Sequence, residues 1–557
     1  MSHVRPHLER LTAPGGPFEV ITEEVGGVPI RTFADRMRHL TELVERGEGH
    51  GDAEFLVHGD TRLTYAVAFD RSRRLAAGLR SSHGVVPGDR VALLGSNAAD
   101  WVVAYWAGVL LDAVVAPLNA WWGPGELTHA LGDAEPAVVV ADARRAPLAV
   151  QAGATPDRMV VWGGDAGRGM PLESLLGEER AEIAPVRGED DPALLFYTSG
   201  TTGTPKGALL THRNVVANVL NLMALVRAAR AAEEEDEEGD AGHSDGQTST
   251  LCVIPLFHAT ANLAFLAPYV SAGNRLVFLP PGRFDPEVAG EVIEREGVTH
   301  FGGVPTVVNR ILDSGVAERR DFSAVRSVTY GGAPASPALV ERIAAVFPGA
   351  RRRLGQGYGL TETSAICTLN LGRDYLEHPD SVGIAAPTVE IRIDPDGEIQ
   401  VRGANVFAGY WRDPESTAAA FTEDGFLRTG DIGFLDDDGF LHITDRAKDV
   451  VIRGGENVYC VEVEAVLESH PAVVEAAVIG RPHPDLGEEV EAVVVLREPT
   501  AAADLGAFVA ERLARFKVPT SWVFRDEELP RTATGKVRKH LLRDGSAVPA
   551  VGRDSAL

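Results

Sequence analysis

Short runs of apolar residues alternate with helix-like segments through most of this chain, and this pattern restricts the fold more than any other feature. Residues 90–94, 113–116 and 137–140 predict strands, and residues 100–111 and 126–131 between them predict helices. Strands that are apolar on both faces are typical of a parallel sheet that helices cover on both sides. The sequence therefore predicts an α/β fold.

The organisation changes toward the C-terminus. From Val389 onward, short strands are separated by Asp-Gly turns, and after Asp445 a smaller unit mixes helices with strands. A chain of 557 residues is also too long for a single hydrophobic core. We therefore expect a large N-terminal domain, residues 1–445, and a small C-terminal domain, residues 446–557.

An acidic stretch interrupts the N-terminal domain. Six consecutive acidic residues, 233–238, begin a segment rich in Gly, Ser and Asp that ends near Thr250. Like charges repel one another and bury no apolar surface, so we expect a disordered surface loop at residues 231–250. A metal site built from this run is the less favoured interpretation.

The overall composition excludes several classes of partner. Acidic residues outnumber basic ones by 80 to 53, and the net charge of −27 argues against nucleic acid and anionic membranes. Three widely spaced cysteines indicate neither a disulfide framework nor a metal cluster. The N-terminus lacks the apolar segment of a signal peptide, and the most apolar window, residues 101–118, predicts a buried helix running into a strand. We therefore expect a cytoplasmic protein without a membrane span.

A loop of unusual composition, residues 197–207, lies between two apolar runs. It holds three glycines, several hydroxyl side chains and Lys206. Such a loop directs backbone N–H groups and hydroxyls toward an anion, and a lysine suits phosphate. It is not a Walker P-loop, because Lys206 stands between Pro205 and Gly207. A flexible linker is the alternative, but it gives no reason for this combination of groups.

At this loop the chain resembles the adenylate-forming superfamily, which includes acyl-CoA synthetases, firefly luciferase and the adenylation domains of peptide synthetases. The resemblance extends over about residues 50–545. It implies a large N-terminal domain of two α/β subdomains plus a small β-barrel-like subdomain, followed by a small mobile α+β C-terminal domain. It also implies that the loop binds phosphate through Thr198, Ser199, Gly200, Thr201, Thr202, Gly203 and Lys206.

Two further glycine-rich stretches, residues 331–334 and 355–363, correspond to the family's adenosine site. The resemblance implies that Tyr358 stacks on adenine, that Thr361 lies beside the phosphates, and that Glu362 holds Mg²⁺, an ion that prefers hard oxygen ligands. A glycine-rich strand end with a solvated glutamate is the alternative. The positions expected to line the site are Gly332, Ala333, Pro334, Gly357 and Gly359.

The segment 428–455 resembles the family's ribose and hinge motifs. Asp431 would accept hydrogen bonds from the ribose hydroxyls, although an aspartate that only stabilises a turn is common. Arg446 would reach the nucleotide, and Lys448 would sit at the hinge between the domains. Gly454 and Gly455 would border the path of the CoA thiol. Many members have proline at the position of Cys460.

Lysine is scarce in this chain, since only Lys206, Lys448, Lys517, Lys536 and Lys539 occur among 53 basic residues. Because arginine fills the other basic positions of the chain, each lysine indicates a position that requires a compact ammonium group. By resemblance, Lys206 and Lys536 are catalytic, and Lys536 bridges the substrate carboxylate and the α-phosphate during adenylation. An ordinary exposed lysine is the alternative for Lys536.

His258, in the stretch 255–260, indicates the kind of acid. Domains of the family that activate amino acids usually have aspartate there to pair with the substrate ammonium, so we expect an acid without an α-amino group. The resemblance implies that the glycine pairs 302–303 and 331–332 lie near the acyl pocket, where we expect such small residues to leave room for a bulky or long apolar acid. A core histidine that caps a strand is the alternative to a catalytic role for His258.

The resemblance implies an acyl-CoA synthetase. Such an enzyme uses ATP with Mg²⁺ to convert a carboxylic acid to an acyl-adenylate, and then transfers the acyl group to CoA. One alternative is a ligase that loads a separate carrier protein, and another is a relative that performs only one half-reaction. The expected partners are the carboxylic acid and CoA, and a homodimer stays open.

Overall fold

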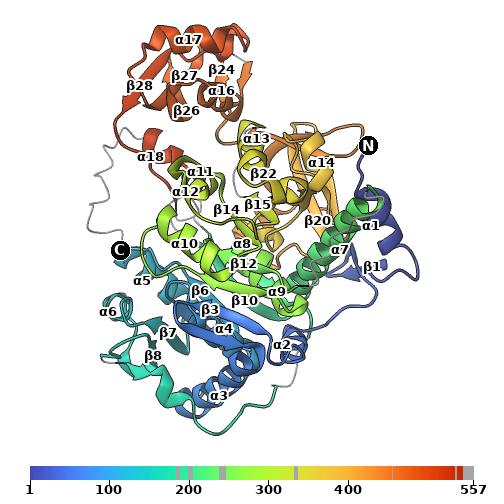
Figure 1. The fold of residues 1–557 in the computed structure, drawn as a ribbon, viewed down its shortest axis with the longest axis vertical. Helices are drawn as coiled ribbons and strands as arrows, with labels where there is room; N and C mark the ends of the chain where they lie inside the picture. Colours follow the sequence, from blue (N-terminus) through green and yellow to red (C-terminus); the bar gives the residue numbers. More distant parts are fainter. Residues whose placement is uncertain are drawn as a thin grey trace.

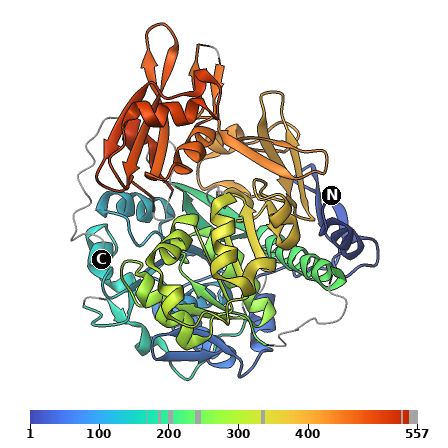
Figure 2. The same ribbon diagram turned by 45° about the horizontal axis from the view of Figure 1, so that its top comes forward.

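The computed structural model describes residues 1–167, 169–183, 188–198, 205–236, 246–331, 337–454, 456–532 and 536–543. Figure 1 shows a large body and, above it, a small C-terminal unit coloured red. Turning the molecule brings this unit forward over the body (Figure 2). The mixture of sheets and helices confirms the α/β prediction.

One sheet of the body is centred on the apolar runs of the sequence. β5 (Arg90–Leu94) pairs in parallel with β6 (Val114–Leu118) and β7 (Val138–Asp142). β10 (Pro192–Thr198) is also parallel to β6, whereas β11 (Lys206–Thr211) is antiparallel to β10. Side chains on both faces of β6 are buried, as its composition predicted. Across this eight-stranded sheet the order is β21 (Gly409–Tyr410), β11 (Lys206–Thr211), β10 (Pro192–Thr198), β6 (Val114–Leu118), β5 (Arg90–Leu94), β7 (Val138–Asp142), β8 (Met159–Trp162) and β9 (Met170–Pro171).

A second sheet of nine strands has a parallel centre and antiparallel edges. The carboxyl ends of its parallel strands lie at one edge, which is where ligands bind in open α/β sheets. Its order is β18 (Ile384–Ala385), β17 (Thr368–Leu371), β16 (Leu354–Tyr358), β15 (Ser327–Gly331), β14 (His300–Gly303), β12 (Ser249–Cys252), β13 (Arg275–Phe278), β3 (Glu54–His58) and β4 (Thr61–Thr64).

Helices cover the two sheets and build the core between them. Trp101, Tyr105 and Trp106 of α4 (Ala99–Leu110) are fully buried, in one apolar cluster with side chains from both sheets. Burial of such large aromatic surfaces dominates core stability. The other helices of this part are α1 (Arg5–Thr12), α2 (Thr41–Glu48), α3 (Tyr65–His83), α5 (Pro124–Ala134), α6 (Ala146–Gln151), α8 (Ala259–Ala261), α9 (Ala267–Ala272), α10 (Pro286–Glu296), α11 (Pro305–Ser314), α12 (Val316–Arg319), α13 (Pro337–Val346) and α14 (Gly372–Glu377).

The last part of the chain forms two small sheets, one on each side of the predicted hinge. The first ends at Arg446 and the second begins at Val451, so Lys448 lies between them. The domain boundary at residues 445–446 stays a prediction. The first sheet contains β19 (Val389–Ile393), β20 (Glu398–Gly403), β22 (Leu427–Leu435) and β23 (Leu441–Arg446). The second contains β24 (Val451–Arg453), β25 (Glu456–Val458), β26 (Val473–His483), β27 (Gly487–Leu496) and β28 (Ser521–Arg525), with α16 (Cys460–Glu468), α17 (Ala502–Ala510) and α18 (Lys539–Arg543) nearby.

The long helix α7 (His212–Asp236) extends further than the sequence predicted. Residues 231–236, expected in a disordered acidic loop, form its last turns, and residues 249–250 begin β12, so the prediction is wrong at both ends. Ion pairs explain the difference, because Glu233 contacts Arg353 at 3.0 Å and Glu235 contacts Arg10 at 3.0 Å. Residues 237–245 lie outside the described residues.

The same helix carries a stretch, His212–Glu235, that is long and apolar enough to cross a membrane. In this structure 67% of its most apolar window is buried inside the protein. Burial of this kind is typical of a core helix, which can have the same apolar composition as a membrane span.

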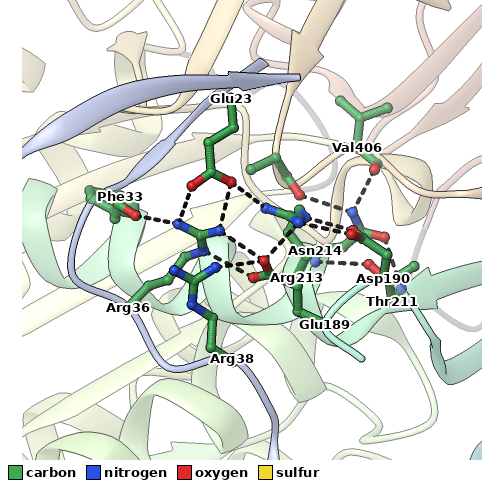
Figure 3. A network of polar contacts seen from close by, with 11 residues as sticks. Glu23, Phe33, Arg36, Arg38, Glu189, Asp190, Thr211, Arg213, Asn214 and Val406 are labelled. Carbon is green, nitrogen blue, oxygen red and sulfur yellow. Dashed lines mark hydrogen bonds and ion pairs between the residues drawn. The ribbon is translucent and has the colours of Figure 1, made fainter. Parts of the chain in front are cut away.

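A buried network of charges connects the N-terminal hairpin to the segment that precedes β10 and the predicted phosphate loop (Figure 3). The side chain of Arg36 is only 1% exposed, and it contacts Glu23 at 2.8 Å and Glu189 at 2.9 Å. Arg213, at the start of α7, also contacts Glu189, at 2.7 Å. Buried charges persist only when paired, so this network connects β1 (Val20–Val25) and β2 (Val28–Phe33), the approach to β10, and α7.

A second buried cluster lies at the other side of the α7 start. Asp112 Oδ1 is 3.3 Å from Nε2 of both His39 and His212, whose rings stack with centroids 3.4 Å apart. The backbone N–H of Leu40 donates to Nδ1 of His212, at 3.3 Å, so the neutral ring carries its proton on Nε2. That N–H and the parallel rings favour a carboxylate shared by two imidazoles over a metal site at these three side chains.

Candidate active site

Ten of the predicted site residues line one connected cavity of about 2800 Å³, whereas Tyr358, Asp431 and Gly454 are not in its wall. The carboxyl ends of β14, β15 and β16 open onto it at Gly303, Gly331 and Gly357. The opposite wall comes from the C-terminal segment 525–541. The cavity therefore lies where the body faces the C-terminal unit. Further predicted residues in its wall are Thr198, Lys206, His258, Gly359, Thr361, Glu362, Arg446, Lys448 and Lys536.

Lys536 stands at the centre of the charges in this cavity. It lies beyond β28 in the chain, and its backbone N–H donates to Thr532 Oγ1 at 3.1 Å. The side chain is accessible, because the cavity is open to solvent, yet protein surrounds it. Partial loss of hydration among the surrounding protein atoms lowers the pKa of the ammonium to about 8; the charges of Arg446 and Lys448 lower it further, and those of Asp431 and Glu362 partly oppose them. The ammonium thus lies close to several of the predicted nucleotide-binding residues.

His258 faces the same space. It immediately precedes the short helix α8. Burial lowers its pKa to about 4, and the nearby charge of Lys536 acts in the same direction, so the ring is neutral at pH 7. Its Nε2 is buried without a hydrogen-bond partner among the described residues. A buried nitrogen without a partner calls for an explanation, and a rotation of the ring that brings Nε2 to a substrate oxygen would supply the missing hydrogen bond.

Glu362 is held in place by a residue that the sequence did not single out. A short 3₁₀ turn, Thr361–Thr363, follows β16 and presents the carboxylate to the cavity. The hydroxyl of Tyr410 donates to Glu362 Oε1 at 2.9 Å. One carboxylate beside the substrate phosphates is a common arrangement for Mg²⁺, so the residues present fit this ion.

Lys206, the first residue of β11, is held by the start of a helix from the body. Its Nζ hydrogen-bonds Ser416 Oγ and lies 3.6 Å from Asp413 Oδ2. Asp413 caps α15 (Pro414–Ala420) by accepting from the backbone N–H of Ser416 at 2.9 Å. Asp followed by Pro is a helix-start signal, so the helix was predictable, but not its contact with Lys206.

Tyr358 and Asp431 contact each other directly. The Tyr358 hydroxyl donates to Asp431 Oδ2 at 2.8 Å, and Nε of Arg446 lies 2.9 Å from Asp431 Oδ1. Burial raises the pKa of Tyr358 well above its usual value, and the charge of Asp431 adds to the effect. Its ring is only 8% exposed, so the neighbouring glycines face the cavity instead. The adenine and ribose roles stay predictions.

Lys448, the predicted hinge residue, and the neighbouring Asp449 contact α18. Arg543 lies 2.8 Å from Asp449 Oδ1 and 3.5 Å from the carbonyl oxygen of Lys448. Gly454 occupies the turn between β24 and β25 with φ of 61°, a conformation that favours glycine. Other predicted residues lie outside the described residues, namely Ser199, Gly200, Thr201, Thr202, Gly203, Gly332, Ala333, Pro334 and Gly455.

Comparison with known families agrees with this geometry. Residues 43–411 match the AMP-binding enzyme family, and residues 462–536 match the AMP-binding enzyme C-terminal domain. Together these matches cover most of the chain and both sides of the cavity.

Individual relatives are similar over nearly their full length. A feruloyl-CoA synthase of Amycolatopsis sp is 37% identical over 90% of this chain and 97% of its own. A long-chain-fatty-acid–CoA ligase of Thermus thermophilus is 35% identical over 92% and 96%. ATP-bound MatB from Rhodopseudomonas palustris superposes with a TM-score of 0.77 and 32% identity, over 90% of this chain and 98% of its own. The chain therefore belongs to the AMP-binding enzyme family of adenylate-forming proteins and is an acyl-CoA synthetase, an acid–thiol ligase that uses ATP and CoA.

Proposed function

We propose that this synthetase activates a bulky or long-chain carboxylic acid without an α-amino group. The observation that supports this most directly is the neutral ring of His258 in the wall of the cavity that Lys536 and Glu362 also line, since a neutral ring does not offer the negative charge that pairs with a substrate ammonium. The names of the feruloyl and long-chain relatives agree with a large acid. A cavity of about 2800 Å³ has room for such an acid beside a nucleotide.

In the first half-reaction, the substrate carboxylate attacks the α-phosphate of ATP, and pyrophosphate leaves. Lys536 stabilises the negative charge that gathers between carboxylate and phosphate. Neutral His258 offers its ring to the acid, and Lys206 with the 197–207 loop holds the phosphates. Mg²⁺ held at Glu362 would neutralise phosphate charge.

In the second half-reaction, the CoA sulfur attacks the acyl carbon of the adenylate, a thioester forms, and AMP leaves with the bonding electrons. We propose that the C-terminal domain turns about Lys448 between the two steps, so that Lys536 withdraws and the turn at Gly454 and Gly455 approaches the thiol. Alternation of this kind lets one site serve two transition states.

The test separates the half-reactions. Lys536→Ala is expected to lower acyl-adenylate formation at least about a hundredfold, as removal of a transition-state charge contact does, while thioester formation from supplied acyl-adenylate is retained. Lys517→Ala, in the same domain but paired with Glu462, is the control and should leave both steps intact. Equal loss of both steps in Lys536→Ala would contradict its role.

The product decides between the acceptors. Mass spectrometry of reactions with ATP, Mg²⁺, CoA and a pooled panel of acids should show a new acyl-CoA. A carrier protein that is loaded while CoA stays free would support the alternative ligase. A homodimer and a cytoplasmic location stay predictions.

A further inference from the structure

A group of polar side chains lies deep in the wall of the cavity, away from the charged residues of the active site. Thr250 of β12, Tyr269 of α9, His300 of β14 and Thr329 of β15 form it, and we call it the His300 network. His300 Nδ1 is 2.8 Å from Thr250 Oγ1, and His300 Nε2 is 2.8 Å from Thr329 Oγ1. The Thr250 and Tyr269 hydroxyls are 2.5 Å apart. Four separate elements thus bring polar atoms to one place.

This network faces the same cavity as the catalytic residues. Tyr269, His300 and Thr329 line it, together with the apolar side chains of Ala264, Phe265 and Pro268. β14 runs from His300 to Gly303 at the cavity's strand-end edge. Three residues of strand span about 10 Å, so the network lies about that far below the level of Gly303.

The network has hydrogen-bonding capacity to spare. Burial lowers the pKa of His300 to about 4, so the ring is neutral and carries one N–H. The three hydroxyls bring the total to four hydrogens, but the network makes only three contacts of 2.8 Å or less. The remaining contact, from the Tyr269 hydroxyl to His300 Nδ1, is longer at 3.2 Å. At least one hydrogen is therefore weakly used and available to a ligand.

A purely alkyl acid gives no reason for these groups. An alkyl chain against the network would leave that hydrogen unpaired away from water, which is unfavourable. Sites that form hydrogen bonds to a substrate oxygen discriminate strongly against an analogue that lacks it.

We propose that the acid substrate carries a neutral oxygen, a hydroxyl or a carbonyl, at the end remote from its carboxylate, and that the His300 network binds this oxygen. The inference rests on the proposed function and adds the chemical class of the acid. The four side chains of the network are uncharged and therefore match a hydroxyl or carbonyl; Arg230 also lines the cavity and its charge acts on Tyr269, so dicarboxylic acids are included in the test.

The test compares paired acids that differ only in the distal oxygen. Straight-chain acids from hexanoic to dodecanoic, and cinnamic acid, are measured against their terminally hydroxylated or oxo counterparts, with pyrophosphate release giving kcat/KM. At least one oxygenated acid should be preferred at least about tenfold over its unsubstituted partner.

Two variants ask whether the network causes that preference. Tyr269→Phe and Thr329→Val each remove one hydroxyl and keep the shape, so each should lower kcat/KM about tenfold for the oxygenated acid only. Val307→Ala, elsewhere in the cavity wall, is the control and should change both acids of a pair alike.

Each of the following results would contradict either the inference or the proposed function on which it rests. Equal use of both acids in every pair, or an unchanged preference in both hydroxyl variants, would overturn the network's role. A preference for dicarboxylic acids would overturn the choice of a neutral oxygen. No acyl-CoA from any acid would instead overturn the proposed function on which the inference rests.

Discussion

The pKa of Lys536 predicts that acyl-adenylate formation declines at moderately alkaline pH. Burial in the cavity and the positive charges of Arg446 and Lys448 lower this pKa from 10.5 to about 8. Because the shift is downward in a cation, the ammonium is lost as the pH rises through about 8. About nine-tenths of the free enzyme carries the charge at pH 7, and about one-tenth at pH 9. We expect kcat/KM for adenylation to fall about tenfold between these values.

The assay is single-turnover formation of acyl-adenylate, quenched and measured by mass spectrometry, with circular dichroism at each pH as a check on folding. Lys536→Arg is the matched control, because a guanidinium keeps its charge throughout this range. The variant should be slower but should lack the alkaline decline. If Lys536→Arg shows the same decline as the natural enzyme, another group titrates, and the reasoning about Lys536 is refuted.

Three further predictions concern contacts in the body. Arg36→Met should lower the free energy of unfolding in urea by about 3–5 kcal/mol, because it leaves buried carboxylates unpaired. The control is Arg38→Met, because Arg38 is exposed and contacts the same Glu189; this variant should change the free energy of unfolding by less than about 1 kcal/mol. Equal effects of the two variants would contradict the role of burial. Asp431→Asn should weaken ATP binding about tenfold in calorimetry, because the variant loses a charged acceptor of hydrogen bonds. An unchanged affinity for ATP would exclude the predicted role of Asp431 as acceptor for the ribose hydroxyls. Asp112 has a φ of 52°, a backbone conformation that glycine adopts freely and alanine does not. Both Asp112→Gly and Asp112→Ala lose the carboxylate, so the glycine variant should have the higher free energy of unfolding in urea, by about 1 kcal/mol. Equal stabilities of the two variants would show that the backbone is unstrained.

Regular elements with strong local signals were predicted closely. The helix expected at residues 100–111 is α4, which spans Ala99–Leu110, and the strand expected at residues 90–94 is β5. Residues 298–301 also predict a strand, but β14 begins and ends two residues later, because β12 and β15 both pair with Gly302 and β15 also pairs with Gly303. Glycine has a low propensity for strands, so Gly302 and Gly303 belong to the strand only because they pair with neighbouring strands.

The acidic run shows the opposite error. Local repulsion predicted disorder for residues 231–236, but Arg10 and Arg353 lie against the end of α7 and pair with its carboxylates. These arginines are distant in the sequence, so no local pattern could indicate them. The hydrogen bonds of Tyr410 with Glu362 and of Ser416 with Lys206 also join residues that are distant in the sequence, so no local pattern indicates them.

The sequence by itself determined the fold class, the family and the order of the motifs, because apolar periodicity and glycine-rich loops are local properties that survive without knowledge of distant contacts. The tertiary structure alone decided which charges share a cavity. Lys536 is far from His258 and Glu362 in the chain, and its lowered pKa depends on enclosure and on neighbouring charges. The His300 network likewise exists only where three strands and a helix meet, since hydrogen bonds require atoms within about 3 Å of one another.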